Sequence, residues 1–561
     1  MTETIARFSL IGAAVCGALV WLLDLAGFKD ASALIVPAIL LAMTGLGLGW
    51  WEKTKAEAAL PTSNTHGSAY EASAAELVAK AKASAAARGA LVPLGKVNGA
   101  PMFHRTEKHV LMLVSAGGGK GVSYLLPNLL SYPGSVFVTD PKGENATISA
   151  GYRATLGKVC VLDPWEITSG EAARYRDTFN PLDAIMNGDR RQVLAKSKAL
   201  AEAFGVVKQN DHWQNASKQL LTALIAHVCT AEKLGKLRDL VTVRELLMEN
   251  FLPALEPEKG KPRSLKKGEE IRSEAAFPVS ALEAMLINDA CEGAIRREAA
   301  GLSRCAVEEL SGILGTAKVA TEFIEETCIR DSLRGRSQTP GPNAGVFGLG
   351  GLDFGDWRRG VLSVFLCVPA RAIRDYPNYV RLVTVAALDT MLEREEVPQA
   401  GPVQFLLDEL GYIGRLDSVE GALGLGRSYG VQIWGVFQNI GMIERDYGRT
   451  GIDTFWSNAG VRIVFASDSA TSEYASKQTG QSTVATTSTS YSEGPAGANV
   501  GSGAGEAGRP LFTPHEVTIR AARDTGKALV FLDGMNVALL DRLRYYADEP
   551  FASRAMPQAS S

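Results

Sequence analysis

Three consecutive glycines followed by a lysine are the residues of this chain best suited to chemistry. The motif reads SAGGGKGVS, from Ser115 to Ser123. Glycines let backbone N–H groups curl around phosphate oxygens, the start of a helix adds its positive dipole end, and a lysine reaches the terminal phosphates. The motif predicts a phosphate-binding loop whose contacts come from Gly117, Gly118, Gly119, Lys120, Gly121, Val122 and Ser123.

The loop departs from the usual phosphate-binding pattern at two positions. That pattern has glycine six residues before the lysine and serine or threonine directly after it. Here Val114 and Gly121 occupy those positions, so the hydroxyl that commonly binds Mg²⁺ is missing and Ser123 is the nearest one. The alternative interpretation is a glycine turn that only joins a strand to a helix, with Lys120 on the surface.

Two adjacent carboxylates far along the chain fit the other half of a nucleotide site. Asp408 and Glu409 follow an apolar run, Val403–Leu407, which predicts a buried strand. At a strand tip, Asp408 can hold Mg²⁺, with Ser123 as an alternative hydroxyl ligand, and Glu409 can polarise the attacking water. Acidic pairs also occur as ordinary caps and loops, but their presence beside a glycine–lysine loop in one chain favours a nucleotide-hydrolysing site.

Two further polar residues are candidates for the same chemistry. Gln438 ends the predicted strand Val431–Phe437, where its amide can contact the γ-phosphate or the attacking water and signal its loss. Arg427 lies near the end of a predicted helix, Leu416–Arg427. It can serve as a cation supplied to a neighbouring subunit's site, and the alternative is simple pairing with the C-terminal end of its own helix.

The elements that position these residues alternate between short apolar strands and helices. Seven buried strands are predicted: His109–Val114, Val136–Val138, Val159–Leu162, Val361–Val368, Val403–Leu407, Val431–Phe437 and Val461–Phe465. This alternation indicates a parallel sheet whose binding loops lie at its C-terminal edge. Asp140, which ends the second strand, is expected at that edge.

The length of 561 residues is too great for one compact core, so two or three domains are expected. Between 190 and 327 apolar residues recur at helical spacing, which predicts an all-α domain inserted between two parts of a nucleotide-binding domain, 91–189 and 328–547. Inside the insertion, the basic segment 256–272 predicts a solvated loop, with a phosphate-contacting patch as the alternative. The net charge of −3 gives no reason to expect that the protein as a whole attracts nucleic acid.

The N-terminus has the composition of a membrane anchor. Phe8–Leu23 and Ala31–Trp51 are uncharged apolar runs joined by a short polar turn, which predicts a two-helix transmembrane hairpin in residues 1–51. More basic residues flank the hairpin than occupy its turn, so both ends of the chain are expected in the cytoplasm. The stretch 52–90, rich in Ala, Glu and Lys, predicts a cytoplasmic linker with a solvated helix at Ala72–Ala87.

The rest of the chain supplies turns and loops. Val484–Gly508 consists of Thr, Ser, Gly and Ala with almost no apolar anchor, which predicts a flexible surface loop. Lys527–Phe531 and Val537–Leu540 flank an Asp-Gly turn and predict a hairpin. The tail 548–561 is expected to be disordered. Seven scattered cysteines without a C-x-x-C pair favour reduced, buried thiols over zinc ligands or disulfides.

Taken together, the segments resemble the TraG/TraD-like coupling proteins of type IV secretion, which are P-loop ATPases. The resemblance rests on SAGGGKGVSYLLPNLL, VFVTDPKGE, VLDP, FNPLD, QFLLDELGYIG, GRSYGVQIWGVFQN, SNAGVRIVFASDSATSEYASKQTG and RPLFTPHEV. They run in the family's order from about residue 100 to 520, and the N-terminal hairpin agrees. The SAGGG loop departs from the family's usual Pro-Thr-x-Ser-Gly, although glycine after the lysine is frequent in the TraG-like branch.

The resemblance implies a RecA-like α/β P-loop domain, an inserted all-α domain and a homo-hexamer at the bacterial inner membrane. It implies that ATP and Mg²⁺ bind between subunits: Gly119 and Lys120 hold the phosphates, Asp408 supports Mg²⁺, Glu409 activates water, Gln438 senses the γ-phosphate, and Arg427 reaches across from the neighbour. ATP hydrolysis would drive transfer of a relaxase–DNA complex or an effector protein. The partners implied are the secretion system's inner-membrane components and ATPases, the membrane, and the cargo or its adaptors at the helical domain.

Two other functions remain compatible with the residues. A membrane-anchored substrate receptor with a degenerate, non-hydrolysing loop would explain the missing hydroxyl after Lys120. A DNA translocase of the FtsK/HerA kind would share the motor chemistry. The two-span anchor and the DPKGE segment favour the coupling protein over the translocase.

Overall fold

The computed structural model describes residues 64–205, 212–249, 251, 280–335, 351–494 and 497–556. They belong to two compact units: one spans Met1–Ala69 and Gly480–Leu511, and the other spans Tyr70–Thr479 and Phe512–Ser561. The predicted transmembrane hairpin, 1–51, lies outside the described residues. Among the residues that are described, no helix is both long enough and apolar enough to cross a membrane.

An eleven-stranded sheet forms the core of the larger unit. Its strands are β1 (Ala90–Val97), β2 (Ala100–Thr106), β3 (His109–Val114), β4 (Val136–Thr139), β5 (Lys158–Leu162), β6 (Leu362–Leu366), β7 (Val403–Leu407), β8 (Val431–Phe437), β9 (Ala459–Phe465), β12 (Lys527–Leu532) and β13 (Ala538–Asp541). Their spatial order is β2-β1-β13-β12-β9-β3-β8-β7-β4-β6-β5. From β9 to β5 the neighbours are parallel, and the remaining pairs are antiparallel.

The parallel strands form where the sequence has continuous apolar runs. Every residue of β3, β7 and β8 is buried, as expected for strands covered on both faces. The three begin and end at the predicted residues. The predicted strand Val361–Val368 is shorter in the structure, where β6 spans Leu362–Leu366. The predicted hairpin is present as the antiparallel pair β12 and β13.

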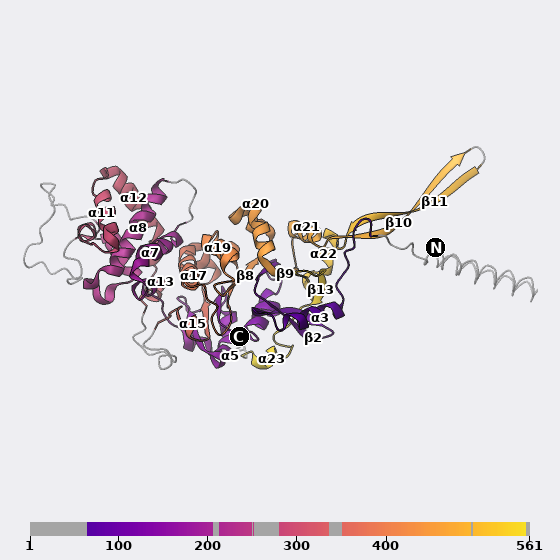
Figure 1. The fold of residues 1–561 in the computed structure, drawn as a ribbon, viewed down its shortest axis with the longest axis horizontal. Helices are drawn as coiled ribbons and strands as arrows, with labels where there is room; N and C mark the ends of the chain where they lie inside the picture. The colour runs from indigo at the N-terminus through magenta and orange to yellow at the C-terminus, as the bar shows by residue number, and fades with distance from the viewer. Residues whose placement is uncertain are drawn as a thin grey trace, which may run out of the picture. The chain divides into compact units, whose positions relative to one another are not determined.

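Helices cover both faces of this sheet. They are α4 (Leu126–Leu129), α5 (Glu144–Leu156), α15 (Asp356–Arg359), α16 (Ala370–Asp375), α17 (Pro377–Leu392), α18 (Leu410–Ile413), α19 (Asp417–Leu425), α20 (Ile440–Asn458), α21 (Ser469–Gln478) and α22 (Pro514–Arg520). Crossovers between parallel strands are nearly always right-handed. Because β4→β5 and β7→β8 step in opposite directions along the sheet, α5 and α19 fall on opposite faces (Figure 1).

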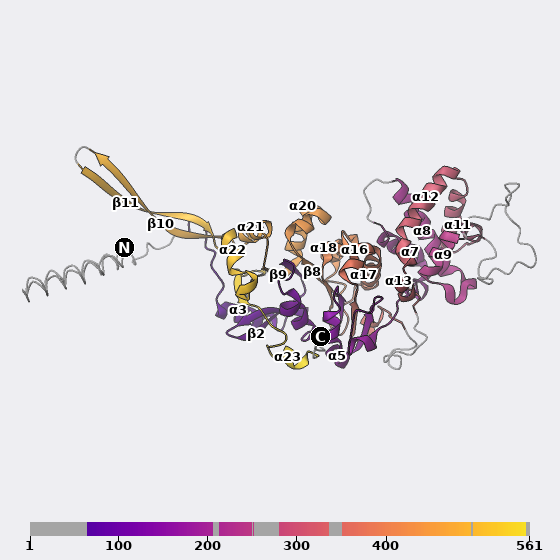
Figure 2. The same cartoon turned by 180° about the vertical axis from the view of Figure 1, so that it is seen from behind.

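The described residues between 190 and 327 contain helices and no strand, as predicted. After α6 (Asp183–Met186), which precedes this range, come α7 (Val193–Ala203), α8 (His212–Thr230), α9 (Leu240–Glu249), α10 (Ala281–Leu286), α11 (Ala294–Leu302), α12 (Val307–Ala320) and the start of α13 (Thr327–Ser332). Both views show α7, α11 and α12 gathered around α8 (Figure 1, Figure 2). The basic segment 256–272 lies outside the described residues.

The prediction of a flexible loop at Val484–Gly508 is wrong. In the smaller unit, β10 (Gln481–Gly494) and β11 (Gly497–Pro510) form an antiparallel hairpin whose pairing runs from Gln481↔Pro510 to Gly494↔Gly497. Ala69, in the same unit, contacts the first strand of this hairpin, because its N–H donates to the carbonyl of Gln481 at 2.9 Å. The two strands pair through backbone hydrogen bonds, which do not depend on apolar side chains.

Two terminal segments of the larger unit also differ from expectation. The helix predicted within the linker 52–90 is α3 (Ala74–Ser84), but it packs against β2 and buries Leu77, so this part is no solvated linker. The predicted disorder of the tail 548–561 is wrong for its described part, because α23 (Phe551–Arg554) buries Phe551 against Leu130 and Leu543. In each segment an apolar side chain packs against the core of the larger unit. Composition alone does not predict such a contact.

Candidate functional site

The glycine-rich turn leaves the carboxyl end of β3 and requires its glycines. Gly117 and Gly119 have φ of +70° and +95°, a region that side chains disfavour. A Cβ added to Gly118 would lie 2.6 Å from Cγ1 of Val114. After Lys120 the chain enters a wide helical turn, Gly121–Leu125, and continues into α4. The loop is therefore a strand-to-helix turn in which glycines leave the backbone free of side chains. A phosphate-binding loop has this form, because its N–H groups must approach the phosphate closely.

Lys120 meets both carboxylates of the acidic pair. Its Nζ lies 2.7 Å from Oδ1 of Asp408 and 2.6 Å from Oε1 of Glu409. The side chains are largely buried, with exposed fractions of 15% for Lys120 and 11% for Asp408. The contact arises because β8 lies between β3 and β7, so the tips of β3 and β7 face each other across a single strand. The prediction that the two strand tips share one site is confirmed.

The electrostatics of this cluster keep the lysine charged. Burial alone would lower the pKa of Lys120, but Asp408 and Glu409 outweigh it, so that the pKa of Lys120 is raised. Burial raises the pKa of Asp408, and the ammonium of Lys120 opposes that rise. The result is a cation held between two carboxylates at the edge where a triphosphate would bring further negative charge.

Gln438 and Glu409 form the second part of the cluster. Nε2 of Gln438 donates to Oε2 of Glu409 at 2.9 Å and to the hydroxyl of Tyr412 at 3.2 Å. Glu409 has φ +61° and ψ +34°, a left-handed conformation that is uncommon for a residue with a side chain. The strained backbone turns this carboxylate from the tip of β7 toward Lys120 and Gln438.

The metal candidates are Asp408, which contacts Lys120, and Ser123, which lies in the turn after the loop. Asp408 is fixed through its backbone, since the hydroxyl of Thr139 donates to its carbonyl at 2.8 Å. Ser123 is buried on the first turn after the loop. The space around Gly121 is open, with no atom within 4 Å of an added Cβ. A carboxylate and a hydroxyl are oxygen donors that Mg²⁺ prefers, so the residues present fit this ion.

Asp140 lies at the predicted edge but is turned inward. It directly follows β4, is 2% exposed, and accepts a hydrogen bond from the N–H of Ala146 at 2.8 Å. Burial raises its pKa to about 7. This carboxylate fixes the start of α5 beside the site.

Arg427 is the one predicted site residue that the structure does not bring to Lys120. The helix α19 ends at Leu425, and Arg427 lies exposed in the following turn. With Arg88 and residues that precede β7 and begin β8, it lines a cavity of about 770 Å³ at the amino-terminal edge of the sheet. Within the described part of the chain its side chain has no hydrogen-bond or ion-pair partner, so the alternative of helix-end pairing is not observed.

Nothing in the sequence marks three residues that hold this site together. Thr139 and Tyr412 contact Asp408 and Gln438 as described above. Arg542 follows β13 and donates to the carbonyl of Gly118 at 2.6 Å. All three are common residue types, far in sequence from most of their partners, and no motif spacing relates them to the loop.

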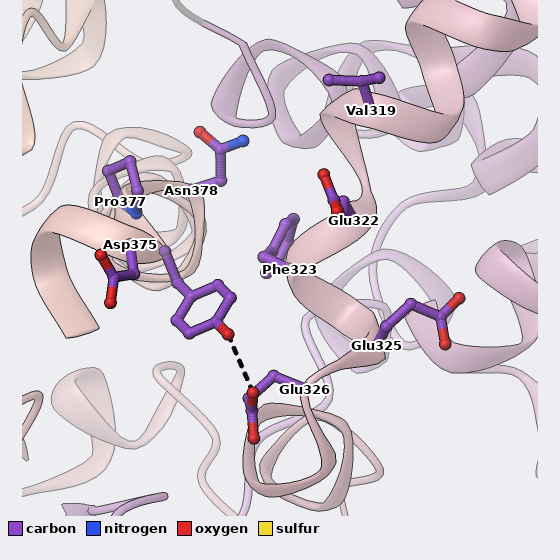
Figure 3. A pocket seen from close by; sticks show the side chains of 9 residues that line it. Val319, Glu322, Phe323, Glu325, Glu326, Asp375, Pro377 and Asn378 are labelled. Carbon is purple, nitrogen blue, oxygen red and sulfur yellow. Dashed lines mark hydrogen bonds between the residues drawn. The ribbon is translucent and has the colours of Figure 1, made fainter.

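A second hollow lies between the helical domain and the sheet (Figure 3). Its volume is about 520 Å³, and its lining includes Glu322, Glu326, Asp375 and Phe323. The hydroxyl of Tyr376 donates to Glu326 at 2.9 Å across it. Because its charged lining is acidic, this cavity repels phosphates, and the candidate for a nucleotide site is the cluster around Lys120.

Comparison with known proteins agrees with this geometry. The family model described as "Type IV secretory system Conjugative DNA transfer" matches residues 65–334 and 350–561. A conjugal transfer protein TraG of Rhizobium radiobacter is 28% identical over 80% of this chain and 62% of its own length. A type IV secretion system-coupling protein VirD4 of Bartonella quintana is 24% identical over 78% of this chain and 63% of its own length. The chain thus spans less than two thirds of these relatives.

Solved structures share the fold. The plasmid coupling protein TrwB in complex with ADP and Mg²⁺ has a TM-score of 0.54 and 14% identity, and the match covers 86% of this chain and 96% of TrwB. The likeness confirms the mixed α/β architecture that the sequence predicts. With the family match over most of its length, the chain belongs to the type IV secretory system conjugative DNA transfer family.

Proposed function

We propose that this chain binds ATP with Mg²⁺ and hydrolyses ATP at the cluster of Lys120, Asp408 and Glu409. The observation that carries the proposal is the contact of Lys120 Nζ with both carboxylates, at 2.7 and 2.6 Å. A glycine-rich turn, its lysine and two carboxylates at a nearby strand tip are the parts of a phosphoryl-transfer site. The TrwB complexes with ADP and Mg²⁺ and with the ATP analogue ADPNP support the same ligands here.

Each residue has a definite task in the proposed reaction. Lys120 exchanges its carboxylate partners for phosphate oxygens, while N–H groups of the loop surround the phosphates. Asp408 holds the hydration shell of Mg²⁺, an ion that neutralises negative charge on the phosphates when bound. Glu409 orients the attacking water and accepts its proton. Gln438, which donates to Glu409, registers the γ-phosphate and its loss.

Arg427 supports an oligomeric form of this site. Its guanidinium is exposed at the sheet edge opposite the loop, too far to act on its own subunit's nucleotide. We propose a homo-hexamer in which Arg427 reaches the triphosphate of the neighbour and stabilises charge there. The cellular role is that of an inner-membrane coupling protein with both termini in the cytoplasm. It recruits a relaxase–DNA complex or effector proteins, through the helical domain or adaptors, to the secretion channel and its ATPases.

The test is ATP hydrolysis by the full-length chain and three variants. Lys120→Ala is expected to abolish binding, and Glu409→Gln to abolish turnover while binding is retained. Arg427→Ala is expected to bind ATP normally but hydrolyse it at least about 100-fold more slowly. Arg88→Ala is the matched control, because Arg88 is an exposed arginine of the same cavity. Equal hydrolysis in all variants would disprove the proposal.

A mixed-oligomer experiment tests the contribution in trans. Arg427→Ala subunits have an intact loop, and Glu409→Gln subunits have an intact arginine. Mixing the two should restore part of the activity, because some sites then combine a functional Glu409 with a neighbour's Arg427. Absence of any restoration, with mixing shown by cross-linking, would contradict the shared site.

Gly121 supplies no hydroxyl for Mg²⁺ directly after Lys120, and no other side chain fills the space beside it. This favours a second candidate, a membrane-anchored receptor that binds but does not hydrolyse nucleotide. Under this function, Glu409→Gln leaves substrate transfer unchanged. Under the motor function it stops transfer. A transfer assay with this single variant separates the two.

A further inference from the structure

A buried arginine lies against the phosphate-binding loop. Arg542 is 9% exposed, and its guanidinium stacks on Phe465, 4.6 Å from the ring centroid. Its Nη1 donates to the carbonyl of Gly118 at 2.6 Å, and its Nη2 donates to the carbonyl of Arg523. One planar fork thus joins the loop to the segment before β12, and the aromatic ring fixes its plane.

The contact with Gly118 determines where the next amide points. In a trans peptide the C=O and the following N–H point in opposite directions. With the carbonyl of Gly118 held by Arg542, the N–H of Gly119 is directed away from the arginine. The φ of +95° at Gly119 belongs to this constrained turn. We propose that Arg542 is a positioning residue that holds the loop in its phosphate-binding conformation; this inference rests on the proposed ATP site.

The charge of Arg542 also favours phosphate binding by the loop. Its hydrogen-bond partners are carbonyl oxygens, and its Nε is buried without a partner among the described residues. Burial lowers the pKa of Arg542, which reflects the cost of burying a cation whose hydrogen-bond acceptors are neutral carbonyls. A phosphate held by the loop one peptide away would offset that cost. The arginine therefore favours an anion in the loop although it contacts only the loop's outer side.

A second contact of the same segment supports this role. The N–H of Tyr545 donates to the carbonyl of Val122 at 3.3 Å. Residues 542–545 therefore run alongside the loop and the turn that follows it. The alternative is that Arg542 only anchors this segment and leaves nucleotide binding unaffected.

The test compares Arg542→Lys with Arg462→Lys in the full-length chain. Lysine keeps the charge but cannot hold two carbonyls with one planar fork. Arg462 is the matched control: it is also 9% exposed, stacks on Trp456 and donates to a carbonyl, but it pairs with Asp533 and does not touch the loop. Binding of a fluorescent ATP analogue with Mg²⁺, the KM and kcat of hydrolysis, and the melting temperature are measured for both.

The expected result is about tenfold or greater loss of affinity in Arg542→Lys, the size of losing a charge-assisted hydrogen bond. KM rises by a similar factor while kcat at saturation changes little, because Glu409 is untouched. Arg462→Lys binds like the wild type. A purely structural role would lower both melting temperatures and leave affinity unchanged in the folded protein, and this outcome would overturn the inference.

Three further cases complete the test. If Arg542→Lys does not fold, Arg542→Gln replaces it, because its amide still donates one hydrogen bond, and the same loss of affinity is expected. If the wild type and Lys120→Ala both fail to bind the analogue, the proposed ATP site is wrong and the inference falls with it. If the wild type binds, Lys120→Ala does not, and Arg542→Lys binds normally, only the inference is wrong.

Discussion

Nζ of Lys120 lies 2.6 Å from Oε1 of Glu409, although 289 positions separate the two residues. The ammonium group of Lys120 is therefore paired with the carboxylates of Glu409 and Asp408, and a phosphate would compete with them for it. Any phosphate that contacts Lys120 has to replace these ion pairs. This exchange leads to the first prediction.

Glu409→Gln is expected to bind ATP as tightly as the wild type or a few-fold more tightly. It removes one of the two anions that compete with phosphate for Lys120, while hydrolysis should fall by at least about 100-fold because the proton acceptor is lost. Equilibrium binding and single-turnover hydrolysis measure the two effects. Glu444→Gln, at an exposed carboxylate on α20, is the control and should change neither. Weaker ATP binding in Glu409→Gln would contradict the competition between carboxylate and phosphate.

Gly121→Ser is expected to strengthen Mg²⁺-dependent ATP binding. The position is open, with no atom within 4 Å of an added Cβ, and its φ lies outside the left-handed region. The serine would place a hydroxyl directly after Lys120, where Mg²⁺ is usually held. ATP affinity is measured at several Mg²⁺ concentrations. Gly118→Ala is the contrasting variant: its Cβ would lie 2.6 Å from Val114, and it should weaken binding.

Stability is expected to fall below neutral pH in part through His109. Its Nδ1 accepts from the N–H of Ile433 at 3.0 Å, a contact that protonation of Nδ1 would break, and its Nε2 donates to the carbonyl of Leu423 at 3.1 Å. Burial lowers its pKa from 6.5 to about 4. The unfolded chain therefore takes up a proton first as pH falls, and the folded state loses about 2 kcal/mol between pH 7 and pH 5.

Urea unfolding at pH 5, 6 and 7 measures this loss, with His109→Gln as the comparison. The variant should be less stable at pH 7 but show a smaller decline toward pH 5. Burial also lowers the pKa of His227 to about 4, so some decline remains. An unchanged slope in His109→Gln would show that His109 does not contribute.

Phe551→Ala is expected to lower the free energy of unfolding by about 3 kcal/mol. The ring is fully buried against Leu130 and Leu543, so its removal leaves a cavity. Tyr546→Ala is the control, since Tyr546 is 60% exposed and should matter by less than about 0.5 kcal/mol. Denaturant unfolding of both variants measures the difference. Equal small effects would restore the prediction of a disordered tail.

The sequence determined the local parts of this protein. Continuous apolar runs located β3, β7 and β8 to the residue, and the glycines with Lys120 identified the loop, because these signals depend on a few neighbouring residues. The composition of Val484–Gly508 was misleading for a physical reason. A hairpin held by its own backbone hydrogen bonds can form without the apolar side chains that pattern reading relies on.

Only the tertiary structure decided which of these parts meet. The insertion of β8 between β3 and β7 brings Lys120 to Asp408 and Glu409, whereas Arg427, although close to Glu409 in sequence, lies at the opposite edge. The contact of Arg542 with Gly118 joins residues 424 positions apart. Strand order and such contacts follow from the packing of the whole sheet, which no short stretch of sequence encodes.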